Sequence, residues 1–162
     1  MTTPFTLRPG TVADVPAALE LVRELAIYEK APNEVVVTEA DMIRDGFGEK
    51  PLFDLIVAEI DQVVIGIALC YVRYSTWKGP ILYLEDLVVK ENYRAHGIGK
   101  ALFEACMKSA RDKGFDGMAW QVLDWNEPAI RFYNKYNSTF SDEWLNGRLT
   151  AAQIDLYFNQ NK

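Results

Sequence analysis

The sequence contains few of the residues from which metal sites and disulfide frameworks are built. It has two cysteines and one histidine in 162 residues. Structural zinc needs a spaced set of such ligands, so no metal site is predicted. Cys70 falls in an apolar stretch and Cys106 on the apolar face of a predicted helix. Buried free thiols are therefore expected rather than a disulfide.

A long apolar run and an excess of basic residues are also missing. The longest apolar stretch, residues 63 to 72, is too short to span a bilayer and is typical of a buried strand. The first residues show neither a basic region nor an apolar signal segment, so we expect a cytoplasmic protein with no membrane partner. A net charge of −6 and a pI near 4.8 argue against nucleic-acid binding and are compatible with a cationic partner.

The chain has 49% apolar residues, enough for one domain over residues 1–162 with a sizeable core. Apolar periods and capping residues predict an α/β fold with one mixed sheet flanked by helices. The strands are expected at residues 5–8, 55–60, 63–74, 80–89, 118–123 and 144–149. The helices are expected from after Thr11 to about Glu29, from after Thr38 to near Gly46, and from Ile98 to before Gly114. Two more are expected to begin after Asn126 and after Thr150.

The most informative segment is an apolar strand that carries two acids and leads into a glycine loop. Tyr83-Leu84-Glu85-Asp86-Leu87-Val88-Val89 is followed five residues later by Arg94-Ala95-His96-Gly97-Ile98-Gly99-Lys100. After Gly97 the apolar residues recur with the period of a helix packed on a sheet. The combination suggests a polyanionic ligand beside an acid–base site.

The glycine loop has the features of an anion site. The first amides of a helix lack intrahelical acceptors, and the helix dipole adds positive charge there. Gly97 and Gly99 leave the backbone uncovered, and Arg94 and Lys100 can add charge-assisted contacts. The loop is not a Walker loop, and Leu102 stands where a dinucleotide fingerprint needs its third glycine. A glycine pair is also ordinary turn chemistry, so the loop alone leaves both interpretations open.

The pattern R-x-x-G-x-G entering a helix after an apolar strand resembles the GCN5-related N-acetyltransferase (GNAT) superfamily. Other segments resemble its spermidine/spermine N-acetyltransferase branch, which includes the thialysine Nε-acetyltransferases. The segments that carry this resemblance are residues 26–30, 45–49, 83–86, 93–94 and 125–128.

The resemblance implies an acetyl-CoA co-substrate and assigns residues to it. The strand backbone would hold the pantetheine arm and the glycine loop the pyrophosphate. The helix that begins after Asn126 would carry the tyrosine that protonates the thiolate. The implied cofactor-binding residues are Leu87, Val88, Val89, Arg94, Ala95, His96, Gly97, Ile98, Gly99, Lys100, Asn126 and Tyr133. His96 is expected to line solvent or a phosphate rather than to act as a base.

Acetyl transfer to an amine needs a group that accepts the amine proton, because an alkylammonium has a pKa of about 10.4. Glu85 is the leading candidate, directly or through a water, since an acid in an apolar strand is costly unless it is used or paired. Asp86 is expected on the opposite face unless a bulge interrupts the strand. The alternative is that both acids satisfy backbone or arginine groups.

The departing thiolate needs a proton, and the resemblance gives this role to Tyr133 in the segment Asn126–Tyr133. The pKa values of phenol (about 10) and thiol (about 8.5) are close enough for useful transfer. By pattern alone, Tyr133 is equally a packing residue of the helix. Asn137, where many relatives carry glycine, can also adopt a left-handed cap.

The expected substrate is a small cationic amine, and the candidate binding residues are Tyr28, Glu29, Trp77, Glu85, Asp86 and Asp124. The polyamine enzymes carry an acid two residues before the tryptophan, whereas this chain has Ser75. A short amine or an amino acid with a side-chain amine is therefore expected rather than a long polyamine. Trp77 can instead protect a sheet edge.

Two alternatives remain open at this point: a protein lysine or N-terminal acetyltransferase, and a CoA-binding sensor without catalysis. The resemblance also implies a homodimer, with the segment from Trp144 to Phe158 contributing to the interface.

Overall fold

A computed structural model describes residues 4–160 of the chain. Its contacts divide the chain into two compact units, Met1–Leu123 and Asp124–Lys162. Each unit is described by itself. In the described residues, no helix is both long enough and apolar enough to cross a membrane, and no three Cys, His, Asp or Glu side chains gather as they would around a metal ion.

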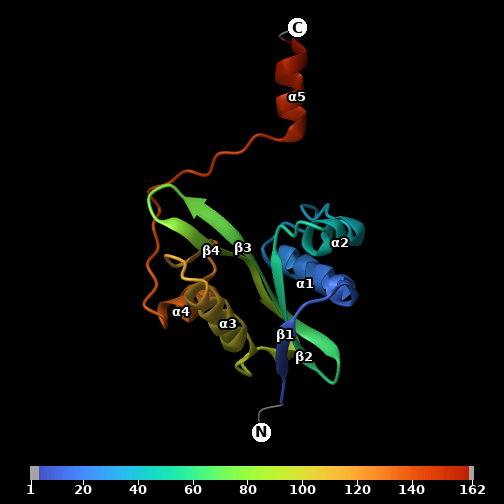
Figure 1. Ribbon diagram of the computed structural model, residues 1–162, viewed down its shortest axis with the longest axis vertical. Coiled ribbons are helices and arrows are strands. Elements are labelled where there is room, and N and C mark those ends of the chain that lie inside the picture. Colours follow the sequence, from blue (N-terminus) through green and yellow to red (C-terminus); the bar gives the residue numbers. More distant parts are fainter. Residues whose placement is uncertain (1–3, 161–162) are drawn as a thin grey trace. The chain divides into compact units, whose positions relative to one another are not determined.

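The first unit is a five-stranded sheet in the order β1-β2-β3-β4-β5, with β1 to β4 antiparallel and β5 parallel to β4. Figure 1 shows α1 and α2 on one face and α3 on the other. The strands are β1 Thr6–Pro9, β2 Asp54–Ile60, β3 Val63–Ser75, β4 Gly79–Val89 and β5 Met118–Trp120. The helices are α1 Val15–Tyr28, α2 Glu39–Phe47 and α3 Ile98–Asp112, with short 3₁₀ turns at Val12–Asp14 and Glu91–Tyr93.

Local signals account for most of these boundaries. Capping boxes begin the turn at Thr11 and helix α2 at Thr38, as predicted. The β2–β3 hairpin turns at Asp61 and Gln62, both with positive φ (49° and 65°), which matches the twist of the strands. Gly114, with a φ of 67°, follows α3.

The core lies on both faces of the sheet. On one face, Val15, Leu19 and Leu21 of α1 pack on Val57 and Ile67 of the central strands. On the other face, α3 approaches β3 so closely that a Cβ at Gly66 would lie 3.3 Å from Leu102 Cδ1. Both cysteines are buried and free, as predicted.

The second unit contains α4 Glu127–Asn134 and α5 Ala151–Gln160. Asn126 caps α4 by accepting a hydrogen bond from the Ala129 amide at 3.3 Å, and Asn137 adopts the predicted left-handed conformation (φ 55°). Thr150 and Gln153 form the predicted box that begins α5.

The strand predicted at residues 144–149 is wrong, because these residues have no regular secondary structure. A strand needs a neighbour for its backbone hydrogen bonds, and Asn146-Gly147 in its middle favours a turn over a strand. Strand β5 also ends at Trp120 rather than at Leu123. The mixed sheet with helices on its faces is otherwise as predicted.

Candidate active site

A β-bulge in β4 places both acids of the central strand on one face of the sheet. Leu69 pairs with Asp86 and Cys70 pairs with Leu84, so Glu85 is the extra residue. Asp86 therefore shares the face of Leu69, which packs with the α1 core, and Glu85 contacts Tyr71 on that same face. The opposite faces expected of a regular strand do not occur, because the strand is bulged.

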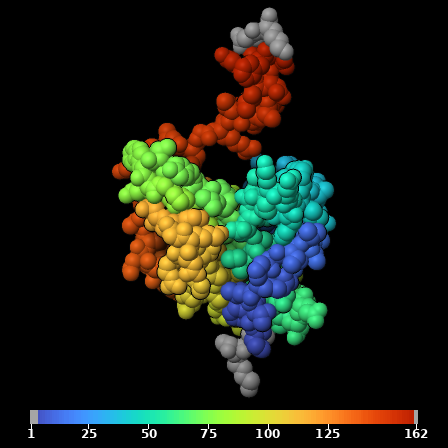
Figure 2. All heavy atoms as spheres, viewed as in Figure 1, coloured from blue at the N-terminus to red at the C-terminus, as the bar shows by residue number. Residues whose placement is uncertain are grey.

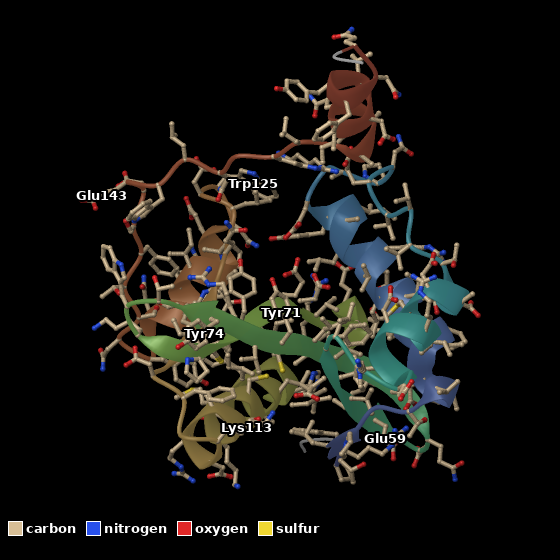
Figure 3. The ribbon with its side chains drawn as sticks, turned by 45° about the horizontal axis from the view of Figure 1, so that its top comes forward. Glu59, Tyr71, Tyr74, Lys113, Trp125 and Glu143 are labelled. Carbon is tan, nitrogen blue, oxygen red and sulfur yellow. The ribbon has the colours of Figure 1, made fainter. Side chains whose placement is uncertain are left out.

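Glu85 is held by a tyrosine from the neighbouring strand. The Tyr71 hydroxyl donates a hydrogen bond to Glu85 Oε2 at 3.1 Å, and its ring lies 5.3 Å from that of Tyr83, the residue opposite it. The Arg73 guanidinium lies 5.3 Å over the Tyr83 ring. Burial, with the Glu85 charge beside it, raises the pKa of Tyr71 to about 12, so its phenol stays a donor at neutral pH. Figure 3 labels Tyr71 on β3, near the middle of the sheet.

Asp86 is the most perturbed acid of this face. Its burial raises its pKa to about 6, and the charges of Glu85 and Glu29 add to the effect. Burial also raises the pKa of Glu29, which follows the last residue of α1. The charges of Glu85 and Glu29 therefore both reach Asp86, and these three acids, called the acid cluster, favour a cation beside them.

The end of α1 fixes the backbone of Tyr28 and Glu29. Lys30 adopts a left-handed φ of 63°, its amide bonds to the Ile27 carbonyl at 3.1 Å, and the Ala31 amide bonds to the Ala26 carbonyl at 2.8 Å. This is a Schellman termination formed without glycine. Glu29 thus reaches the acids of β4 from a rigid helix end.

The edge of β4 that faces β5 is open beyond the bulge. Within residues 4–160, β5 pairs with β4 only from Leu82 to Leu84, because β5 ends at Trp120. Leu87 to Val89 remain bonded to β3 on their other side. The open edge can accept an extended arm as an added strand, which is the role predicted for Leu87, Val88 and Val89.

The loop before α3 fits a pyrophosphate group. Ala95 and Gly97 have positive φ values of 64° and 83°, and Gly97 precedes the first turn of α3. A Cβ built at Gly97 meets nothing within 4 Å, and one at Gly99 meets Val89 Cγ2 at 3.8 Å, so both glycines border open space that a ligand can occupy. Successive amides at a helix start bind anions.

The side chains of this loop divide into three groups. Ile98 is buried, which leaves only its backbone for a ligand. His96 is exposed, with Nδ1 2.7 Å from the Arg94 carbonyl oxygen, and Lys100 pairs with Glu104 at 3.4 Å. Arg94 donates from Nε to the Val89 carbonyl at 3.0 Å, and its guanidinium carbon lies 5.8 Å over the Tyr28 ring.

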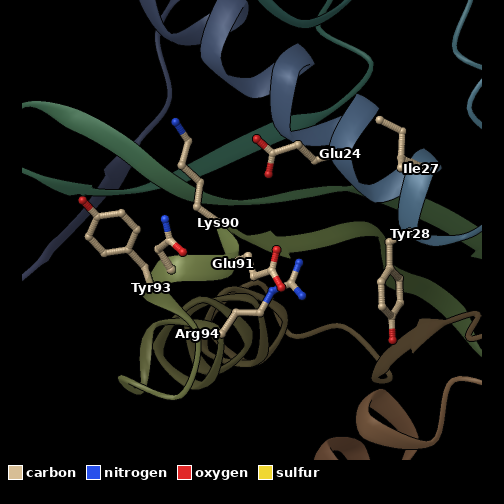
Figure 4. Close-up of a pocket in the computed structure, with 8 residues that line it drawn as sticks. Glu24, Ile27, Tyr28, Lys90, Glu91, Tyr93 and Arg94 are labelled. Carbon is tan, nitrogen blue, oxygen red and sulfur yellow. The ribbon is translucent and has the colours of Figure 1, made fainter.

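A pocket of about 550 Å³ lies between the end of α1 and the start of this loop (Figure 4). It brings together Tyr28 and Arg94, two of the predicted site residues. Its wall also includes residues that the sequence did not point to. Tyr71, which bonds to Glu85, was likewise not predicted as a site residue. Their contacts depend on strand register and helix packing, which no local pattern in the sequence reports. The lining residues are Glu24, Ile27, Tyr28, Lys90, Glu91, Asn92, Tyr93 and Arg94.

Trp77 lies at the tip of the β3–β4 hairpin and is 86% exposed. The amides of Trp77 and Lys78 both bond to the Ser75 hydroxyl at 3.2 Å, so Ser75 shapes the turn. Figure 2 shows this hairpin in light green at the surface. A substrate role for Trp77 stays a prediction.

Three predicted residues belong to the second unit. Tyr133 is 8% exposed and its ring lies 5.2 Å from that of Phe132. Asn126 is also buried, with its side-chain oxygen used in the α4 cap. The roles of Asn126, Tyr133 and Asp124 stay predictions.

The sequence of the chain is similar to those of known acetyltransferases. Residues 19–137 match the model of the acetyltransferase (GNAT) family. The chain is 41% identical to a thialysine N-epsilon-acetyltransferase of Bos taurus over 135 residues, which cover 78% of this chain and 79% of that protein. It is 34% identical to the human spermidine/spermine N(1)-acetyltransferase-like protein 1 over 80% of this chain and 20% of that protein.

Solved structures support the fold. An aminoglycoside acetyltransferase from an uncultured soil metagenomic sample superposes with a TM-score of 0.73 at 22% identity, over 90% of this chain and 95% of that one. An aminoglycoside N-acetyltransferase in complex with CoA superposes with a TM-score of 0.72 at 18% identity and the same coverage. The chain belongs to the GNAT acetyltransferase family and is an acyltransferase.

Proposed function

We propose that the chain is an acetyl-CoA-dependent N-acetyltransferase that acetylates a primary amine of a small cationic substrate by direct transfer. The observation that carries this proposal is the convergence of Glu85, Asp86 and Glu29 beside the open edge of β4. A cationic amine and an extended cofactor arm can then meet at one strand. The thialysine N-epsilon-acetyltransferases among the relatives support the same chemistry.

The cofactor is held by two segments of the first unit. Leu87 to Val89 offer backbone groups to the pantetheine arm, and Arg94 to Lys100 offer amides and positive charge to the pyrophosphate. Asn126 and Tyr133 of the second unit are the other residues proposed to bind the cofactor. When bound, acetyl-CoA supplies the thioester carbonyl that the neutral amine attacks.

Glu85 accepts the amine proton, directly or through a water. The Tyr71 hydroxyl fixes one carboxylate oxygen of Glu85 and leaves the other for the substrate. Asp86 is a second candidate, since a pKa of about 6 lies closer to that of an amine than an ordinary carboxyl pKa does. The Glu85→Gln and Asp86→Asn variants separate the two, because the true base controls the acidic limb of the pH–rate profile.

Tyr133 donates a proton to the CoA thiolate. The ordinary pKa of a phenol, about 10, is close enough to that of a thiol for proton transfer. Burial of Tyr133 restricts its ring to few orientations. The Tyr133→Phe variant removes the hydroxyl and keeps the ring, so a loss of kcat with unchanged CoA binding supports this role.

The substrate is a short diamine or an amino acid with a side-chain amine. The candidate residues for recognising it are Glu29, Trp77, Glu85, Asp86 and Asp124, whereas the Tyr28 ring contacts Arg94. Ser75 stands where the polyamine enzymes carry an acid in the hairpin. Its hydroxyl accepts hydrogen bonds from the Trp77 and Lys78 amides of the turn. Each ammonium of a long polyamine needs a partner, so spermine is expected to be a poorer substrate.

The test is CoA release from acetyl-CoA with thialysine, lysine, putrescine, spermidine, spermine and a histone-tail peptide. We expect the highest kcat/KM with thialysine or a short diamine. A preference for spermine would favour the polyamine activity named in the human relative, and a preference for the peptide would favour protein acetylation. Tight binding of acetyl-CoA without turnover of any amine would indicate a sensor.

The proposal includes a homodimer. The segment from Trp144 to Phe158 exposes large apolar side chains, including Trp144 (78%) and Leu145 (97%), and such surfaces usually bind a protein. Analytical ultracentrifugation tests this part of the proposal.

A further inference from the structure

Tyr28 lies between the acids proposed to bind the amine and the glycine loop proposed to bind the pyrophosphate. It is the last residue of α1, directly before Glu29 of the acid cluster, and it lines the pocket that also contains Arg94. The Arg94 guanidinium carbon lies 5.8 Å from the centre of the Tyr28 ring, within the range of a cation–π contact. Figure 4 shows Tyr28 on α1 and Arg94 on the loop that leads to α3.

Both partners are fixed at the backbone. The Schellman termination at Lys30 and Ala31 holds the end of α1. On the other side, the Arg94 amide bonds to the Glu91 carbonyl at 3.1 Å, and Arg94 Nε bonds to the Val89 carbonyl at 3.0 Å. The aromatic ring is therefore a further restraint on a long side chain that otherwise has many rotamers.

One hydrogen bond and one ring contact leave most of the five guanidinium N–H donors for a ligand. An arginine that is ordered before binding loses less conformational entropy when it meets a phosphate. Since Arg94 covers one face of the Tyr28 ring, that face is not open to a substrate ammonium. The contact thus gives Tyr28 a different role from the substrate contact predicted for it.

We infer that Tyr28 is a positioning residue for Arg94, holding the guanidinium ready for the pyrophosphate of the acyl donor. The inference rests on the proposed function, because Arg94 has a phosphate ligand only if the chain uses a CoA thioester. The Tyr28 ring, not its hydroxyl, performs the positioning.

The test is a double-mutant cycle. The dissociation constant of CoA is measured by calorimetry for the wild type, Tyr28→Leu, Arg94→Ala and the double variant, with Tyr28→Phe as the matched control that keeps the ring. We expect Tyr28→Leu to weaken CoA binding about two- to fivefold, the range of an exposed cation–π contact, and Tyr28→Phe to bind like the wild type. In the Arg94→Ala background the Tyr28→Leu change should have no further effect.

A shorter acyl donor tests whether Tyr28 acts through the pyrophosphate site. Acetyl-pantetheine lacks the pyrophosphate, so its KM should be equal for the wild type and Tyr28→Leu, while the KM of acetyl-CoA rises and that of the amine is unchanged. Additive losses in the cycle, or a rise in the amine KM alone, would overturn the inference and return Tyr28 to the substrate site. If the wild type binds no CoA, the proposed function fails as well, whereas normal CoA binding with no effect of Tyr28→Leu refutes the inference alone.

Discussion

The two proposed catalytic residues come from regions that are built differently. Glu85 lies in the central strand β4, where the bulge, the Tyr71 hydrogen bond and the packed β3 neighbour fix its place. Tyr133 lies in an eight-residue helix whose start is set by the Asn126 cap. Long-range strand pairing therefore arranges the acid cluster, while a local cap sets where the helix of Tyr133 begins. Variants in the two regions should therefore affect the protein differently.

The largest expected effects are catalytic. Glu85→Gln and Tyr133→Phe should each lower kcat about 10²- to 10⁴-fold, because each removes a group that moves a proton. Steady-state CoA release with the preferred amine measures both. CoA binding should stay unchanged in both variants. A loss of CoA binding that accounts for the lower rate would contradict the assigned roles.

The free energy of unfolding should respond very differently to substitutions in the first and second units. Phe103 of α3 is 1% exposed and packs edge-on against Trp120, so Phe103→Ala should lower the free energy of unfolding by about 3–5 kcal/mol. Leu145, 97% exposed in the second unit, should cost less than about 0.5 kcal/mol when changed to Ala. Urea unfolding at low protein concentration gives both values. A large cost at Leu145 would show that this region is packed in solution.

The acid cluster makes stability and activity respond to pH in opposite directions. The pKa of Asp86 is about 6 in the folded chain and lower in the unfolded chain, so the folded state binds the extra proton between these values. The free energy of unfolding therefore falls as pH rises from 4 to 6, and Asp86→Asn should recover about 2 kcal/mol at pH 7. Activity should instead fall about tenfold from pH 7 to pH 5 if ionised Asp86 is needed.

These two readouts can be taken from the same protein. Urea unfolding of the wild type and Asp86→Asn between pH 4 and 8 gives the first, and kcat/KM over the same range gives the second. A destabilised Asp86→Asn variant at pH 7 would show that the carboxylate is paired rather than penalised.

The smallest expected effects come from removing helix caps. Thr38→Ala removes the side chain that bonds the Asp41 amide at 3.2 Å, and Asn126→Ala removes the α4 cap. Each should cost about 1 kcal/mol locally. Hydrogen exchange should show α2 amides opening faster in the first variant and α4 amides in the second. Faster exchange throughout the sheet in the Asn126→Ala variant would contradict a locally set α4.

The local sequence predicts the helix starts well because caps are short-range chemistry. The boxes at Thr11, Thr38 and Thr150, and the caps at Asn126 and Asn137, all occur. It predicts tertiary features less well. The bulge at Glu85, the early end of β5 and the missing strand near Trp144 depend on which backbone groups find partners elsewhere in the chain.

The candidate site divides in the same way. The glycine loop and the acids of β4 could be chosen from the sequence, since their residue types are costly or unusual where they stand. The Tyr71 bond to Glu85, the Tyr28 contact with Arg94 and the raised pKa of Asp86 could not, because each joins residues on different elements.

The proposed reaction is tested most directly by amine-dependent CoA release by the wild-type chain with acetyl-CoA and thialysine, with the product identified by NMR. We expect turnover that places the acetyl group on the side-chain amine and that is lost in Glu85→Gln. CoA binding with no release for thialysine or any short diamine would contradict the proposed reaction, and undiminished turnover in Glu85→Gln would contradict the assigned base.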